Sequence, residues 1–354
     1  MGILELFSQI PGQDRLADEL KAHLADPKNS YFFIGAEDVG AVKVIQTFAK
    51  AIMCEHDGCG ICASCIAIER GVHPDVFFYQ RVGAALRIDD AREIVSLAYR
   101  STSGSKYQII VVPELELVER AAPALLKSVE EPPLSTIFML QASTETPELR
   151  TLMSRSVVFR LDSISDQQIY QHLIDTGISA ENAERSVRLS AGNLERAIEL
   201  STDHQLSDAT AIWEEVPTLV TQNLPLILNL VDRLLEAVSL REERKKLEHK
   251  RELDEAGELA KSLGVKKASL TEKIEARQKR ELRRIRTTDL RSGLLLLERQ
   301  YRSSYLSSDT SESKVKYCIK AIELIEDTQL ALKRNANEFL LIMALLTRLA
   351  DISN

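Results

Sequence analysis

The chain has no run of about 18 apolar residues and no leader in which charged residues precede an apolar stretch. The first absence predicts no transmembrane helix, and the second predicts no signal peptide. We therefore expect a cytoplasmic protein with no membrane partner. The sequence also lacks an internal repeat of fixed period and a low-complexity tract, so it does not indicate a repeat protein.

An excess of basic residues is also missing. Lys and Arg number 45 against 53 Asp and Glu, which gives a formal net charge of −8 at pH 7. A protein that coats nucleic acid by bulk charge is therefore not expected, although local basic stretches remain. With 354 residues, the chain is long enough for two or three domains, each with its own core.

Cysteine is scarce, and four of the five cysteines are clustered in the short segment 54–65. Gly58 and Gly60 supply the tight turns that would let four thiolates converge on one ion. A structural zinc ion with four sulfur ligands is the predicted occupant, because such a site leaves no open position for water. An iron–sulfur cluster and four free thiols are the alternatives. The four candidate ligands are Cys54, Cys59, Cys62 and Cys65.

Two histidines lie near this cluster, and a fifth cysteine lies far from it. We interpret His56 and His73 as surface or loop-packing side chains rather than further ligands. Cys318 is interpreted as a buried small apolar residue.

Helical stretches alternate with short apolar runs from residue 1 to about residue 160. Strands that alternate with helices predict an α/β core, a mostly parallel sheet covered by helices on both faces. The predicted strands are 31–34, 76–79, 108–112, 137–141 and 157–161.

The rest of the chain is predicted to be helical, with a boundary at Gly192-Asn193 and no convincing β run in 207–354. The Leu-rich run 339–346 predicts a helix buried on most of its surface. A highly charged segment, 241–286, has Gly264 near its middle, which predicts a helical hairpin turn.

The charged segment has two possible interpretations. Its basic stretches, 241–251 and 276–286, could contact duplex phosphates. Acidic residues are interleaved with the basic ones, which favours an exposed helix with i,i+4 ion pairs.

A glycine-containing turn follows the run 31–34, where a phosphate-binding loop would lie. Gly35 and Gly40 match the spacing of G-x-x-x-x-G-K-[S/T], a loop that binds phosphates with backbone N–H groups and Lys, and Mg²⁺ with a hydroxyl. Ala41 and Val42 stand where the Lys and the hydroxyl belong. Lys43 cannot substitute, because a helical residue two positions further on points to nearly the opposite face. We therefore expect a degenerate loop for which ATP is an unlikely cofactor.

The run 108–112 is followed by a second defective element. In a phosphate-loop ATPase, the carboxylate that closes this strand holds Mg²⁺, but Pro113 occupies that position here. Glu114 follows, and without a Lys or Mg²⁺ partner we interpret it as a solvated surface acid. Two defective elements in one chain favour a retired nucleotide site over a chance glycine spacing.

The segment 120–133, RAAPALLKSVEEPP, predicts a short helix that ends at two prolines. It resembles the corresponding segment of bacterial clamp-loader subunits. The motifs IPGQ at 10–13, HPD at 73–75 and IDDAREI at 88–94 occur in the family's order, so the resemblance covers roughly residues 8–200. The tail, with RNAN at 334–337 before a Leu-rich helix, is similar to the family's collar domain.

This resemblance implies a three-domain AAA+ protein. The AAA+ core would span 1–162 with the zinc module at 54–65, and a helical lid would span 163–206. A helical collar that mediates oligomerisation would span 207–354 and carry the charged segment 241–286.

The implied function is to complete the pentamer that opens a sliding clamp and places it on primed DNA. The partners would be motor and delta-type subunits, the clamp and, through the complex, the DNA. The eroded loop favours the ATPase-inactive delta-prime type of DNA polymerase III subunit. A working motor ATPase of gamma/tau type and a stand-alone zinc-containing DNA-binding module are the alternatives.

The resemblance also implies roles for single residues. The family's Ser-Arg-Cys motif reads Ser154-Arg155-Ser156 here. In the family this arginine is a finger that reaches the γ-phosphate bound by the neighbouring subunit, so Arg155, with Ser154, is the catalytic candidate in trans.

Two further comparisons with the family concern the lid and the zinc module. Arg196 lies near the nucleotide-sensing arginine of active relatives, but Glu195 takes that place, which favours a vestigial or structural role for Arg196. The gap of four residues after Cys54 is shorter than is usual in the family, so its assignment as a ligand is the least secure of the four.

Overall fold

The computed structural model describes residues 13–35, 40–56, 58–79, 86, 88–115, 122–133, 135–220, 224–306, 312–332 and 336–353. The chain forms two compact units. The first contains residues 1–168 and 253–277, and the second contains residues 169–252 and 278–354. The middle of the charged segment therefore groups with the α/β part of the chain. No helix among the described residues is long and apolar enough to cross a membrane.

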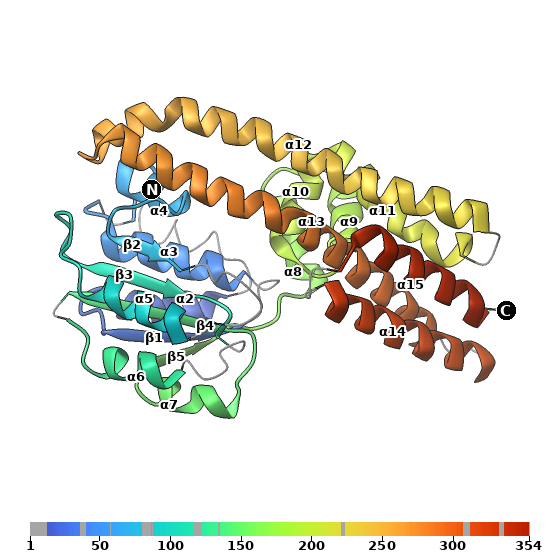
Figure 1. The fold of residues 1–354 in the computed structure, drawn as a ribbon, viewed down its shortest axis with the longest axis horizontal. Helices are drawn as coiled ribbons and strands as arrows, with labels where there is room; N and C mark the ends of the chain where they lie inside the picture. The colour runs from blue at the N-terminus through green and yellow to red at the C-terminus, as the bar shows by residue number, and fades with distance from the viewer. Residues whose placement is uncertain are drawn as a thin grey trace. The chain divides into compact units, whose positions relative to one another are not determined.

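A five-stranded parallel sheet forms the centre of the first unit, in the order β2-β3-β4-β1-β5 (Figure 1). Every predicted apolar run is a strand, so the parallel α/β sheet is confirmed. In the central pair, Phe32 of β1 aligns with Leu140 of β4. Parallel strands end at one common edge, where ligands bind in open α/β sheets. The strands are β1 (Ser30–Ile34), β2 (Val76–Phe78), β3 (Gln108–Val112), β4 (Thr136–Ala142) and β5 (Val157–Arg160).

Helices cover both faces of this sheet, because its strands are apolar on both sides. Successive residues of β1 point to opposite faces: Phe32 belongs to the core beneath α5, α6 and α7, whereas Tyr31 and Phe33 belong to the core beneath α2 and α3. The helices of this unit are α2 (Asp14–Ala22), α3 (Ala41–Met53), α4 (Ala63–Glu69), α5 (Ile88–Ala98), α6 (Ala122–Glu130), and α7 (Arg150–Met153) after the 3-10 turn η3 (Pro147–Leu149).

The second unit contains helices and no strand among its described residues. Helices from both sides of residue 206 share one apolar core, in which Leu200 of α10 clusters with Trp213 of α11 and Leu294 of α13. The helices from residue 166 onward, of which residues 166–168 and 253–277 belong to the first unit, are α8 (Asp166–Asp175), α9 (Ala180–Leu189), α10 (Leu194–Thr202), α11 (His204–Leu219), α12 (Leu224–Ser262), α13 (Lys267–Leu306), α14 (Glu312–Leu332) and α15 (Glu338–Ser353).

The helix boundaries follow local sequence signals. Asn193 caps α10, since its Oδ1 accepts the N–H of Arg196 at 2.8 Å, and Gly192 before it adopts a φ of 89°. The predicted boundary at Gly192-Asn193 is therefore confirmed. The turn predicted near Gly264 is also present: α12 ends at Ser262, α13 begins at Lys267, and Gly264 has a φ of 66°.

The expectation that the Leu-rich run 339–346 is buried on most of its surface is wrong. α15 buries a single face, whereas Leu340 is 64% exposed and Phe339 is 39% exposed. The helix is amphipathic because it packs on the rest of the unit along one stripe. The stripe consists of Ile342, Leu345, Leu346 and Leu349.

Candidate functional site

The glycines expected to frame a phosphate-binding loop, Gly35 and Gly40, lie between β1 and α3. Residues 36–39 lie outside the described residues. Gly40 has a φ of 75° and precedes α3, whose first residue, Ala41, is fully buried. Val42 is half-buried. The Nζ of Lys43 lies 2.6 Å from Oε1 of Glu69 on α4. Positions 41 and 42 thus present only methyl groups, and the nearby Lys side chain pairs with a helix.

Gln141 at the end of β4 links the strand ends that surround this loop. Its Nε2 donates to the carbonyl oxygen of Gly35 at 2.7 Å, and its Oε1 accepts the N–H of Glu114 at 2.8 Å. The amide is buried, so both hydrogen bonds lie in a low-dielectric environment. Glu114 has a φ of 55°, and Pro113 precedes it directly after β3. Sequence reasoning missed Gln141, although a Gln within the apolar run TIFMLQA was an available signal.

Arg155 and Ser154 lie together in the loop between α7 and β5. The Nε–H of Arg155 donates to the carboxylate of Glu130, the last residue of α6. Its Nη1 donates to the carbonyl oxygen of Thr151 at 3.1 Å and to Oγ of Ser154 at 3.2 Å. The side chain of Arg155 is 36% exposed. The arginine is thus accessible and oriented, and sequence reasoning did not predict Glu130 as its partner.

Ser156 anchors the same loop to the sheet. It stands where the family motif has cysteine, and its Oγ lies 2.7 Å from Oγ of Ser30 at the start of β1. It also donates to the carbonyl oxygen of Leu152 at 2.9 Å. A hydroxyl therefore fills the missing cysteine's position with two hydrogen bonds.

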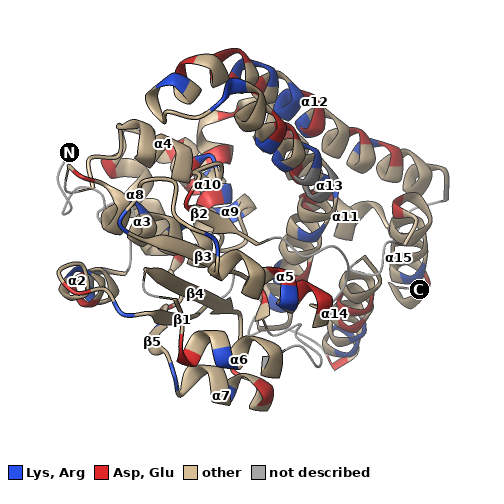
Figure 2. Ribbon diagram, turned by 60° about the vertical axis from the view of Figure 1, so that its left-hand side comes forward, with Lys and Arg blue, Asp and Glu red and all other residues tan. Residues whose placement is uncertain are grey.

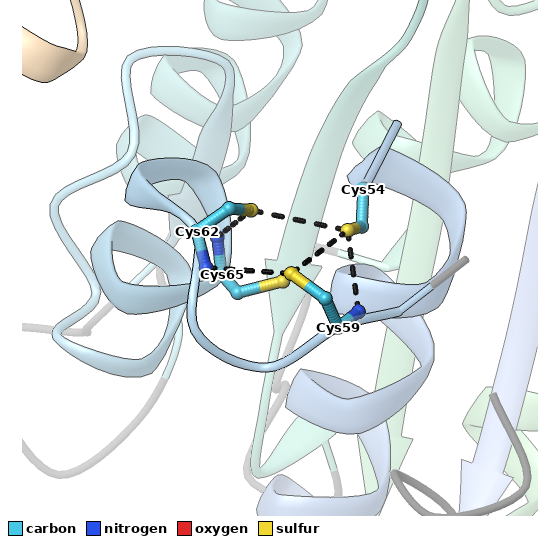
Figure 3. Close-up of side chains that lie close together, drawn as sticks. All are labelled: Cys54, Cys59, Cys62 and Cys65. Carbon is cyan, nitrogen blue, oxygen red and sulfur yellow. Dashed lines mark hydrogen bonds between the residues drawn. The ribbon is translucent and has the colours of Figure 1, made fainter. Parts of the chain in front are cut away.

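The four clustered cysteines converge on one point (Figure 3). All four sulfur atoms lie within 4.8 Å of one another. The Sγ of Cys54 is 3.7 Å from that of Cys59 and 3.8 Å from that of Cys62. Tetrahedral zinc with Zn–S bonds of about 2.3 Å separates its sulfurs by about 3.8 Å. The described geometry therefore fits a four-sulfur metal site, and Cys54 is part of it despite the short gap that follows it.

Backbone amides surround the sulfurs and favour the thiolate form. The N–H groups of Cys59 and His56 donate to Sγ of Cys54 at 3.4 and 3.3 Å. A hydrogen bond from the backbone of Ile61 lowers the pKa of the Cys59 thiol to about 6. Burial raises the pKa of the Cys65 thiol, so that ligand needs a cation to ionise at neutral pH. Zinc would supply that charge.

His73 is buried next to the cysteine segment and contacts Ser64 in it. It is 5% exposed, its Nδ1 accepts the N–H of Asp75 at 3.1 Å, and its Nε2 lies 3.1 Å from Oγ of Ser64 on α4. Because Nδ1 accepts, the proton belongs on Nε2, which donates to Ser64. Burial lowers the pKa of His73 to about 4, so the ring is neutral at pH 7. The HPD motif thus links the cysteine segment, through Ser64, to the start of the strand β2.

Arg196 lies in a buried ion-pair network within the second unit. Its guanidinium contacts Asp289 of α13 at 3.2 Å, Glu199 at 3.3 Å and Oγ1 of Thr210 at 3.0 Å. Arg241 of α12 joins the network through the same two carboxylates. Arg196 therefore links α10 to α11 and α13 within the second unit.

The charged segment is held together largely by ion pairs between its own helices. Figure 2 shows acidic and basic residues alternating along α12 and α13. Lys245 of α12 lies 3.1 Å from Glu281 of α13, and Arg286 of α13 contacts Glu242 of α12 at 3.6 Å and Glu338 of α15 at 2.7 Å. Many of the cations thus pair with an acidic residue on the other helix of the hairpin, and others pair along their own helix.

The chain is similar to known DNA polymerase III subunits over its α/β part. Residues 12–165 match the family described as DNA polymerase III, delta subunit. The tau/gamma subunit of Haemophilus influenzae is 33% identical over 178 residues, covering 47% of this chain and 25% of that protein. The delta' subunit of the same organism is 32% identical over 151 residues, covering 41% and 46%. The chain thus spans well under two thirds of these relatives.

A solved structure extends the likeness in fold to nearly the whole chain. The gamma subunit-related protein of DNA polymerase III from Thermotoga maritima superimposes with a TM-score of 0.51 at 16% identity, over 95% of this chain and 99% of that one. At this identity the likeness shows the fold alone, a parallel α/β core followed by helices. Residues 12–165 are thus similar to subunits of DNA polymerase III, both by the family match and by the relatives that align with the same region.

Proposed function

We propose that this chain is a delta-prime-type subunit that completes the clamp-loader pentamer without hydrolysing ATP itself. The observation that carries the proposal is the loop after β1, where Ala41 and Val42 supply neither cation nor hydroxyl and Lys43 is paired with Glu69. Each charge-assisted contact to a triphosphate contributes roughly 1.5–3 kcal/mol, so their loss removes most of the nucleotide affinity. Pro113 likewise supplies no Mg²⁺ ligand.

The proposed contribution to catalysis is Arg155, delivered in trans. A guanidinium that reaches the γ-phosphate bound by a motor subunit would stabilise the charge that develops on the phosphoryl oxygens. Ser154 and Glu130 support its orientation from the same loop and from α6. The partners would be motor and delta-type subunits, the sliding clamp and, through the complex, primed DNA.

Assembly is proposed to use the helical unit, with the domain limits 1–162, 163–206 and 207–354. Apolar side chains remain exposed on α14 and α15, including Ile319, Leu330 and Leu340. Exposed apolar residues on a helical face suit a protein partner. Their burial in the complex would give the collar its oligomerising role.

Steady-state phosphate release by the isolated chain tests the loss of ATPase activity. We expect a rate equal to the buffer blank and weak or absent Mg·ATP binding. A Gly40→Arg variant controls for contaminating ATPases, since a side chain is strained at this positive φ and would fill the loop. Activity well above the blank that Gly40→Arg abolishes would contradict the proposal.

A motor-type ATPase is the second candidate, because several similar relatives are tau or gamma subunits. One of them, tau of Bacillus subtilis, is 29% identical over 239 residues, covering 60% of this chain and 41% of that protein. The missing loop Lys disfavours this candidate. Tight Mg·ATP binding by the purified chain would support it.

We further propose that the cysteine cluster holds one structural Zn²⁺. Elemental analysis of protein purified without chelator should give one zinc and no iron per chain. Cys54→Ser and Cys59→Ser should each lose the metal, whereas Cys318→Ser, in the second unit, should retain it. Retention of zinc by Cys54→Ser would exclude Cys54 as a ligand.

A further inference from the structure

The tip of the hairpin formed by α12 and α13 packs on the cysteine module. Residues 253–277 and the module both belong to the first unit. They share a small apolar core, separate from the two cores that flank the sheet. Its buried members are Ala67 of α4 and Val72, which follow the module in the chain, and Ala256, Leu259, Ala260, Leu270 and Ile274 from the hairpin. The clamp-loader function proposed above does not use this core.

Polar contacts border this core on two sides. Arg70, directly after α4, donates to Glu255 of α12 at 2.5 Å. Lys273 of α13 lies 6.0 Å from the ring centroid of Phe77 on β2, at the limit of a cation–π contact. Both helices of the tip thus make polar contacts, α12 with the residue that follows α4 and α13 with the edge strand β2.

The surface that receives the hairpin depends on the cysteines. α4 has only seven residues, and a helix this short is not stable alone. Its N-cap is Cys62, whose Sγ accepts the N–H of Cys65 at 3.5 Å, and Cys65 itself is fully buried in the first turn. Ala67 lies about half a helical turn after Cys65 in the same helix. Convergence of the thiolates therefore holds the helix that presents Ala67 to the hairpin.

We propose that residues 253–277 form a metal-dependent clasp on the cysteine module. Binding and folding of a structural zinc site are coupled, so loss of the ion unfolds 54–65, removes the receiving face of α4 and releases the tip. By linkage, a docked tip also tightens metal binding by the same factor. The metal dependence rests on the zinc binding proposed above. The docking contact itself is supported by the apolar core.

Hydrogen exchange of the full chain, followed by mass spectrometry, tests the metal dependence. With zinc bound, we expect amides of 255–263 to be protected. Removal of zinc by a chelator should reduce this protection at least tenfold and returning zinc should restore it, with no change at 342–349 in the second unit. Zinc content is measured in parallel. Protein that binds no metal would refute the zinc proposal, whereas unchanged protection after verified zinc loss would overturn the clasp.

Two variants on α12 separate docking from the metal. Ala256→Arg forces a long cation into the fully buried contact, and Glu258→Arg places the same side chain at a site 83% exposed. With zinc present, Ala256→Arg should lose the protection of 255–263 and bind zinc more weakly, and Glu258→Arg should behave as wild type. Full protection in Ala256→Arg would overturn the docking contact. Zinc affinity equal to wild type in an undocked Ala256→Arg would overturn the coupling.

Discussion

The Nε–H of Arg155 donates to the carboxylate of Glu130, which lies 25 positions earlier in the chain at the end of α6. The pair links the proposed arginine finger to the EEPP end of the helix in the same subunit. The pair is accessible to solvent, so its contribution to folding stability is small.

Arg155→Ala should lower ATP hydrolysis at the neighbouring motor site by on the order of 10³-fold, the lower range for arginine fingers. Lys at 155 should restore little, because an ammonium lacks the planar fork of donors. Phosphate release by the reconstituted loader, with clamp and primed DNA, measures the effect. Arg150→Ala, an exposed arginine on α7, is the matched control. A wild-type rate at that site in Arg155→Ala would show that Arg155 is an ordinary surface residue.

Glu130→Gln should leave stability within about 1 kcal/mol of wild type, because the pair is partly exposed. It should still slow hydrolysis at the neighbouring site by roughly 10-fold to 100-fold, since a misplaced catalytic group costs rate without changing the fold. The adjacent exposed residue provides the control, Glu131→Gln, which should match wild type. Equal rates for the two variants would remove Glu130 as a positioning residue.

Gly293→Ala should destabilise the second unit by about 1–3 kcal/mol, the usual cost of overpacking. A Cβ at position 293 would lie 2.0 Å from Cε2 of the buried Trp213. This clash outweighs the gain of about 1 kcal/mol in helix propensity. Gly257→Ala is the control, because its Cβ would meet only the Lys267 side chain, at 3.5 Å. This variant should raise the free energy of unfolding. Urea unfolding followed by circular dichroism compares them, and equal midpoints would contradict the predicted clash.

His73 should make stability rise with pH between about 4 and 6.5. Burial lowers the pKa of His73 in the folded state from its usual 6.5 to about 4, so the unfolded state binds more protons in this window. The stability is fully present above pH 6.5 and is lost as pH falls towards 4, by about 3 kcal/mol at most. His73→Asn should flatten the pH slope of the unfolding free energy, and His204→Asn, at an exposed site, should not. Identical slopes for wild type and His73→Asn would exclude this role.

The amino-acid sequence alone determined the strands, the apolar side chains at positions 41 and 42, the hairpin turn and the clustering of the cysteines. Each of these features is local. Runs such as 108–112 are apolar on both faces, Gly264 needs a left-handed turn, and the four cysteines lie within 12 positions of one another. Spacing along the chain was therefore enough to predict them.

Only the tertiary structure decided which distant side chains meet. Gln141 reaches Gly35 across 106 positions, and Arg70 reaches Glu255 across 185 positions. The grouping of 253–277 with the α/β unit, and the exposure of Leu340 on a Leu-rich helix, also depend on packing. Hydrophobic burial is non-directional, so a sequence pattern indicates that a face will be covered, while the folded chain alone specifies what covers it.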